Sequence, residues 1–109
     1  MNNLAEKKCQ SCEGHPKPLA MEKADELAKE LAAGWAIKNG KQLQKSFEFP
    51  DFKTALDFTN EVGQIAEEEG HHPDVFLSYG KVKLEISTHS AGGLTENDFI
   101  LAAKVDELK

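Results

Sequence analysis

Apolar and polar positions along this chain follow two periods, one typical of helices and one typical of strands. From Ala20 to Ala33, apolar residues recur every three to four positions among strong helix formers. This pattern predicts a helix that stops at Gly34. The preceding residues 1–18 are mostly polar and contain one glycine and two prolines, so we expect an arm that is ordered only if other residues hold it.

After this first helix the sequence alternates between hairpins and helices. Asn39-Gly40 separates two strand-like runs and favours a type I′ turn, because that turn requires positive φ at both central positions. Pro50-Asp51 suits the start of a long helix, and Gly70 suits its end. A second hairpin is predicted to turn near Gly80-Lys81, where a second pair of strand-like runs meets.

The spacing of apolar residues also predicts which helix faces are buried. Thr95 and Asp98 have the spacing of a capping box at the start of the last helix, with Asp in place of the usual Glu. The expected buried residues of the long helix are Phe52, Ala55, Leu56, Thr59, Val62, Ile65 and Ala66, and those of the last helix are Phe99, Ile100, Ala103 and Leu108.

The order of elements indicates an α+β fold in which a hairpin–helix unit occurs twice after the first helix. Two hairpins that alternate with helices favour a four-stranded antiparallel sheet with helices packed on one face. We therefore predict one domain over residues 19–109, preceded by the arm of residues 1–18. An exposed edge strand in so small a domain would be a natural surface for dimerisation.

Composition and charge exclude several classes of protein. The 109 residues carry a net charge of −6 and no basic cluster, so direct nucleic-acid binding is not expected. No apolar run approaches the roughly 18 residues of a membrane span, and no signal peptide is visible, so we expect a cytoplasmic protein. Cys9 and Cys12 are then expected to be thiols.

The candidate chemistry is concentrated in three histidines and two carboxylates. His71 and His72 follow the long helix, and His89 follows the last predicted strand. Taken singly, each has an ordinary structural explanation, because a histidine at a helix end often interacts with helix carbonyls. Loops of this kind can meet at one end of a helix-backed sheet. Three imidazoles near Glu67 and Asp98 would then suit proton transfer near neutral pH.

A metal site is the main competing interpretation of these residues. Three histidines and a carboxylate could hold zinc, but adjacent histidines such as His71 and His72 rarely place both rings on one ion. A second possible metal or redox feature is "CQSCEGH", residues 9–15, but one CxxC without a partner pair supplies at most three ligands. We therefore expect no metal and rank acid/base chemistry first.

The spacing of these residues resembles the signature of the pterin-4a-carbinolamine dehydratases. The order is Glu67, three residues, His71-His72-Pro73, five residues, Tyr79, nine residues, His89, eight residues and Asp98. The segments "FEFPDFKTALDFTNEVGQIAEEEGHHP" and "NDFILAAKVDEL" are also similar to that family, and a CxxC in the arm looks like its bacterial members.

The resemblance implies a fold, an activity and partners. The family fold is a single α+β domain with a four-stranded antiparallel sheet, and members form homodimers or tetramers. The implied reaction is dehydration of 4a-hydroxytetrahydropterin to quinonoid dihydropterin, without metal or organic cofactor. It regenerates the pterin that aromatic amino acid hydroxylases have used, which implies a functional link to such a hydroxylase.

The resemblance also implies roles for individual residues. His71, His72 and His89 would carry acid/base catalysis, and His71 and His89 would lie next to the ring. Glu67 and Asp98 would orient imidazoles. The implied substrate contacts come from the three histidines and from Pro73, Thr88, Ser90 and Ala91.

Two alternatives remain open at this stage. Animal members of the family also stabilise dimers of a transcription factor, so the chain could act as a dimerisation or coactivator module. The same pocket could also serve another pterin. The interpretation predicts that His89→Ala lowers the dehydration rate by roughly one to three orders of magnitude, and that deletion of residues 1–17 leaves activity intact.

Overall fold

The computed structural model describes residues 4–6, 18–88 and 91–108. The predicted order of one helix followed by two hairpin–helix units is confirmed, with one additional short 3-10 helix before it. The elements are η1 (Leu4–Glu6), α1 (Met21–Ala28), β1 (Ala36–Lys38), β2 (Gln42–Glu48), α2 (Phe52–Glu69), β3 (Asp74–Ser78), β4 (Lys81–Ile86) and α3 (Glu96–Asp106).

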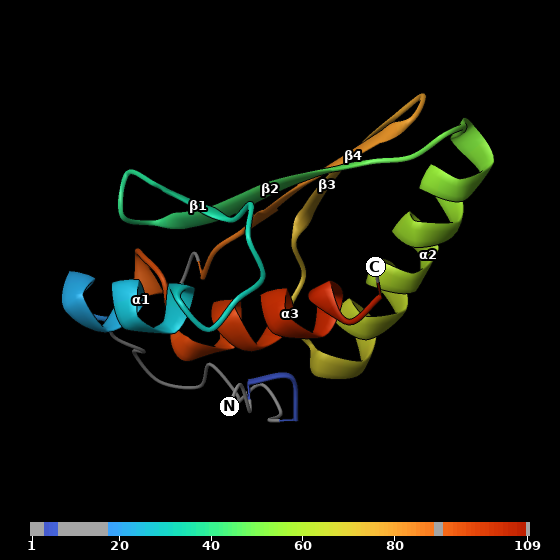
Figure 1. Ribbon diagram of the computed structural model, residues 1–109. Helices are drawn as coiled ribbons and strands as arrows, with labels where there is room; N and C mark the ends of the chain where they lie inside the picture. Colours follow the sequence, from blue (N-terminus) through green and yellow to red (C-terminus); the bar gives the residue numbers. More distant parts are fainter. Residues whose placement is uncertain (1–3, 7–17, 89–90, 109) are drawn as a thin grey trace.

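The four strands form one antiparallel sheet in the order β1-β2-β4-β3, and the helices cover one of its faces (Figure 1). The predicted α+β class is therefore confirmed. The second strand of each hairpin lies inside the sheet, so the β2–β4 pairing joins the two hairpins. Along β4, Val82, Leu84 and Ile86 are buried, whereas Lys83 and Glu85 lie on the opposite face, as expected for a strand with one covered face.

Helix α3 lies at the centre of the molecule. The sheet covers one side of α3, and η1 packs below α3 in Figure 1, on the side away from the sheet. This double cover explains why residues on nearly all sides of α3 are buried, a larger set than the sequence pattern predicted. Leu4 of η1 is only 2% exposed and belongs to the same core cluster as Phe99. The described part of the predicted arm is thus held by the core.

Helix α1 is shorter than predicted, because it ends at Ala28 and not at Ala33. The next backbone N–H groups bond three residues back, from Glu30 to Leu27 and from Leu31 to Ala28. The N–H of Ala32 then donates to the carboxylate of Asp106 at 3.0 Å. A contact with the end of α3 therefore turns the chain away from the helix axis before Ala33, where the apolar spacing predicted the helix to end.

Helix α2 has the predicted boundaries, and the predicted burial of Ala55, Val62 and Ala66 is confirmed. The Asp51 side chain caps its first turn by accepting the Thr54 N–H at 2.8 Å, and this bond lowers the pKa of Asp51 below 3.8. Gly70 ends the helix in the left-handed region, with φ of 65°. The expected burial of Phe52 and Leu56 was wrong, because they are 44% and 37% exposed. Phe58 is buried instead, against the ring of Phe47.

Candidate active site

His71 is positioned by the end of α2. Gly70 reverses the backbone there, and the N–H of His71 bonds to the carbonyl of Ala66 at 3.2 Å. The imidazole of His71 is buried, and its Nε2 lies 2.6 Å from Oδ1 of Asp98. The helix stop after the first hairpin–helix unit thus presents this histidine to a carboxylate in the last helix, α3.

Asp98 is positioned by the start of α3 and is 0% exposed. The predicted capping box with Thr95 is confirmed, and the N–H of Thr95 donates to Oδ2 of Asp98 at 2.8 Å. The hydroxyl of Thr88 donates to the same oxygen at 2.8 Å. Because Oδ1 binds His71, both oxygens of this carboxylate have hydrogen-bond partners.

Thr88 and Thr95 complete this buried network. Their hydroxyl oxygens lie 2.9 Å apart, and Thr88 is only 3% exposed. Thr88 pairs with Gly93 in an isolated bridge, which holds the segment between β4 and α3 against the start of the helix. We define the Asp98 network as the side chains of His71, Thr88, Thr95 and Asp98, which come from three different parts of the chain.

A second histidine–carboxylate pair lies beside this network at the surface. Nε2 of His72 forms a short contact with Oε2 of Glu67, in the last turn of α2. Both side chains are exposed. This pair and the contact of Glu69 with Lys104 reduce the repulsion among the three carboxylates in the last turn of α2.

The structure brings together part of the site that the sequence predicted. His71, Thr88 and Asp98 share one network, and His72 pairs with Glu67. Pro73 is half-buried after the histidine pair, and the N–H of Ala91 bonds to the carbonyl of Thr88 at 3.0 Å. His89 and Ser90 lie outside the described residues, as do Cys9, Cys12 and His15.

The sequence interpretation missed Thr95 as a member of the site. It treated this residue only as a helix cap, and the capping-box spacing alone does not show that its hydroxyl reaches Thr88. Within residues 4–6, 18–88 and 91–108, no three histidine, cysteine or acidic side chains are close enough to form a metal site. In the same ranges, no helix is long and apolar enough to cross a membrane.

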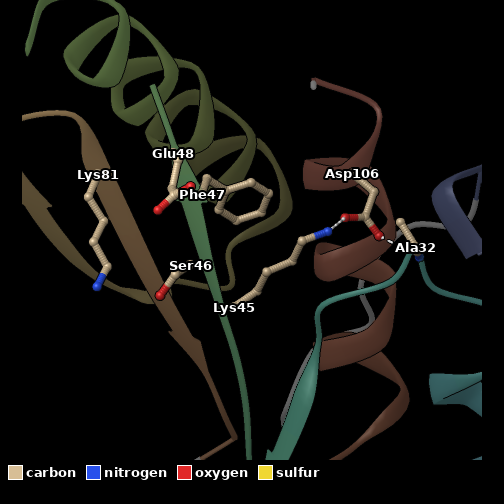
Figure 2. Close-up of a pocket in the computed structure, with 7 residues that line it drawn as sticks. All are labelled: Ala32, Lys45, Ser46, Phe47, Glu48, Lys81 and Asp106. Atoms are coloured by element: carbon tan, nitrogen blue, oxygen red, sulfur yellow. Dashed lines mark hydrogen bonds and ion pairs between the residues drawn. The ribbon is translucent and has the colours of Figure 1, made fainter. Parts of the chain in front are cut away.

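A second carboxylate, partly buried, lies at the other end of α3. Asp106 accepts hydrogen bonds from Nε1 of Trp35 at 3.0 Å, from Nζ of Lys45 at 3.0 Å and from the N–H of Ala32. Figure 2 shows Lys45 reaching from β2 towards Asp106 beside a cavity of about 540 Å³. Neither of the described histidines, His71 and His72, lines this cavity, so the cavity and the His71–Asp98 contact are in different places.

Comparison with known proteins defines the class of this fold and site. Residues 17–108 match the family described as pterin 4 alpha carbinolamine dehydratase. A relative from Alkaliphilus metalliredigens, provisionally named pterin-4-alpha-carbinolamine dehydratase, is 49% identical over 98% of this chain and 96% of its own. One from Rubrobacter xylanophilus with the same provisional name is 46% identical over 99% and 100%. The chain therefore belongs to the pterin-4a-carbinolamine dehydratase family.

Solved structures agree with this assignment. A transcriptional coactivator/pterin dehydratase from Brucella melitensis superposes with a TM-score of 0.78 at 33% identity, over 84% of this chain and 98% of that one. A pterin dehydratase-like protein described as a RuBisCO assembly factor of the alpha-carboxysome superposes with a TM-score of 0.60. It is 23% identical over 69% of this chain and 88% of that one, so it shows the shared fold alone.

Proposed function

We propose that this chain dehydrates 4a-hydroxytetrahydropterin to quinonoid dihydropterin by histidine acid/base catalysis without a metal. The observation that carries this proposal is the buried contact of His71 with Asp98, 2.6 Å long. A carboxylate held against an imidazole fixes the ring and stabilises its charged form, which is the arrangement that acid/base catalysis requires. Membership of the pterin-4a-carbinolamine dehydratase family supports the choice of substrate.

The reaction needs one proton donor and one proton acceptor. The 4a-hydroxyl leaves as water after an acid protonates it, and the proton on N5 passes to a base. His71 takes one of these roles in the proposal, and His72, paired with Glu67 at the surface, assists. His89 takes the other role on the strength of the family motif.

A stopped-flow assay tests this proposal. The substrate is generated in situ, and its ultraviolet decay is followed in EDTA with the wild-type protein and with His71→Ala. We expect acceleration by the wild-type protein and a loss of about 10²- to 10⁴-fold in the variant, the usual range for an acid/base group. His15→Ala, which changes a histidine outside the family motif, is the matched control and should retain full activity.

Three results would contradict the proposal. Failure of the wild-type protein to accelerate the decay would exclude the dehydratase activity. Full activity of His71→Ala would remove that histidine from the mechanism. Loss of wild-type activity in EDTA would show that the reaction depends on a metal.

Self-association is part of the proposal. Phe52 and Leu56 lie one turn apart on the exposed side of α2, and together they form an apolar surface that a second copy would cover. We propose a homodimer or tetramer. Light scattering should give a mass of two or four chains, and Leu56→Glu should reduce it. A monomeric wild-type protein at micromolar concentration would contradict this.

The cellular role follows from the proposed activity. The chain would recycle the pterin of an aromatic amino acid hydroxylase in the cytoplasm, so hydroxylation with a limiting amount of pterin should proceed further when the chain is present. Addition of His71→Ala in place of the wild-type chain is the control. If the two proteins have the same effect, recycling is not the role of this site.

A protein-binding role is the second candidate. Phe76 and Tyr79 are exposed on β3 and at the adjoining turn, and Phe76 lies beside Lys83 on the sheet face that no helix covers. Exposed aromatic residues beside cations are common at protein interfaces. Wild-type protein without dehydratase activity would favour this role, and Phe76→Ser would then be expected to abolish partner binding.

A further inference from the structure

The hydrogen bonds around Asp98 have assignable directions. The N–H of Thr95 can only donate, and an ionised carboxylate can only accept. Thr88 therefore donates its single hydroxyl hydrogen to Oδ2 of Asp98, and it accepts the hydroxyl hydrogen of Thr95. The two hydroxyls thus form a directed chain that ends on the carboxylate.

These hydrogen-bond directions determine which nitrogen of the His71 ring carries a hydrogen. Oδ2 of Asp98 has two donors, and Oδ1 faces Nε2 of His71 at 2.6 Å. Because the carboxylate accepts, Nε2 must carry a hydrogen. In the neutral ring the other nitrogen, Nδ1, is then without a hydrogen and can accept a proton.

We propose that the hydroxyls of Thr88 and Thr95 are positioning groups that hold Asp98, and that Nδ1 of His71 is the atom that exchanges protons with the substrate. The second half of this inference rests on the proposed dehydratase function, whereas the first half does not. The family resemblance implied that Thr88 contacts the substrate. Its hydroxyl instead bonds to Thr95 and Asp98 inside the protein, so we assign it the positioning of Asp98.

The capping role of Asp98 does not by itself explain this network. A capping box requires only the side chains and backbone of Thr95 and Asp98. Thr88 lies ten residues before Asp98 and outside the helix, yet it is buried with its hydroxyl on the carboxylate. Without Thr88, one backbone N–H alone would hold Oδ2, and the carboxylate could turn away from His71.

The tautomer of His71 is the direct test. Two-bond ¹H–¹⁵N spectra of uniformly labelled protein, at a pH high enough to leave the ring neutral, show which nitrogen carries the hydrogen. His71→Gln identifies the signals by their disappearance. We expect the Nε2–H form in the wild-type protein. The Nδ1–H form there would overturn the inference. The tautomer is determined in the wild-type protein, and His71→Gln serves only to assign the signals.

Variants at Thr88 test the positioning role. Thr88→Val keeps the shape but removes the hydroxyl, and we expect mixed tautomers of His71 together with a kcat lower by roughly 10- to 100-fold, the range for one hydrogen bond to a charged group. KM should change by less than about threefold. Thr88→Ser restores the hydroxyl and should restore both readouts.

Thr59→Val is the matched control for these variants. Thr59 is also partly buried, but its hydroxyl bonds to the carbonyl of Ala55 within α2, so its loss should leave the His71 tautomer and kcat unchanged. A raised KM with an unchanged tautomer in Thr88→Val would make Thr88 a substrate ligand and overturn its positioning role.

Failure of this inference is distinguishable from failure of the proposed function. A wild-type protein that shows the Nε2–H tautomer, loses it in Thr88→Val and has no dehydratase activity would overturn the function but support the positioning role. An active wild-type protein with the opposite tautomer would support the function and overturn the inference.

Discussion

Each end of α3 carries an aspartate with several hydrogen-bond partners, buried in the case of Asp98 and partly buried in the case of Asp106. The two aspartates have different partners. Asp98, at the first turn, binds His71 and two threonines. Asp106, at the last turn, binds Lys45, Trp35 and the backbone of Ala32. Both carboxylates are hydrogen-bonded to groups of the protein itself. The presence of such hydrogen bonds therefore does not by itself distinguish a functional aspartate from a structural one.

The difference lies in whether the partner can change its proton near neutral pH. A lysine ammonium ordinarily titrates far above neutral pH. The pair of Lys45 with Asp106 connects β2, α3 and the loop after α1. An imidazole can gain or lose a proton in that range, so the pair of His71 with Asp98 can take part in proton transfer. The cavity beside Asp106 does not make Asp106 the candidate for proton transfer, because its charged partner there is Lys45 and not a histidine.

Within this comparison, the largest expected effect is the loss of activity in Asp98→Asn. An amide carries no charge to stabilise an imidazole that gains a proton during the reaction, so we expect kcat to fall by about 10²- to 10³-fold. Stopped-flow dehydration at 25 °C measures this, with circular dichroism as a check of folding. The comparison fails if Asp106→Asn, assayed where it is folded, loses as much activity as Asp98→Asn.

The second effect is a loss of stability in Asp106→Asn. Lys45 is only 13% exposed, and without its partner it would be a buried charge, which costs about 3 kcal/mol. Urea unfolding measures this change. Asp57→Asn removes an exposed ion pair with Lys53 on α2 and should change the free energy of unfolding by less than about 0.5 kcal/mol. Equal effects of the two variants would show that the Asp106 connection is not structural.

The third effect concerns the segment packed under the middle of α3. Leu4→Ala leaves a cavity in the core, and we expect it to lower the free energy of unfolding by about 2–3 kcal/mol. Deletion of residues 1–17 would also remove the carbonyl of Ala5 that Lys104 binds, so this deletion is now expected to destabilise the domain. Glu6→Ala, at an exposed position of η1, is the control. Unchanged stability of Leu4→Ala would restore the interpretation of a dispensable arm.

The smallest effect is expected at Asp51, an exposed carboxylate with a single local role. The Thr54 N–H holds the pKa of Asp51 below its ordinary value, so the cap stabilises the protein above pH 3.8 and loses this contribution as the pH falls through the lower folded-state pKa. Asp51→Ala should therefore lower Tm at pH 7, and the difference from wild type should shrink towards pH 2. A difference that does not vary with pH would exclude the ionised cap.

Local features of the sequence predicted much of the fold and part of the site. Asn39-Gly40, Asp51, Gly70 and the pair Thr95 and Asp98 have conformational or capping preferences that operate within a few residues, and the structure confirms the turn and the helix ends that they predict. The early end of α1 was not predictable in this way, because it depends on Asp106, 74 residues beyond Ala32.

The burial of α2 and η1 shows the same limit. The apolar spacing of α2 is compatible with more than one buried face, and only packing against the sheet selects the face with Phe58 over the one with Phe52 and Leu56. Leu4 is one of few apolar residues in a mostly polar segment, and it is buried because η1 packs against α3 on the side away from the sheet.

The element order, the helix caps and the histidine–carboxylate spacing that marks the family can be predicted without coordinates, because these properties depend on neighbouring residues. Which side chains meet depends on the packing of distant elements. His71 reaches Asp98 across 27 positions, and the hydroxyl of Thr88 turns inward to the same carboxylate. Such contacts depend on how the β2–β4 pairing and the packing of α2 against α3 bring the two hairpin–helix units together, and no local pattern specifies them.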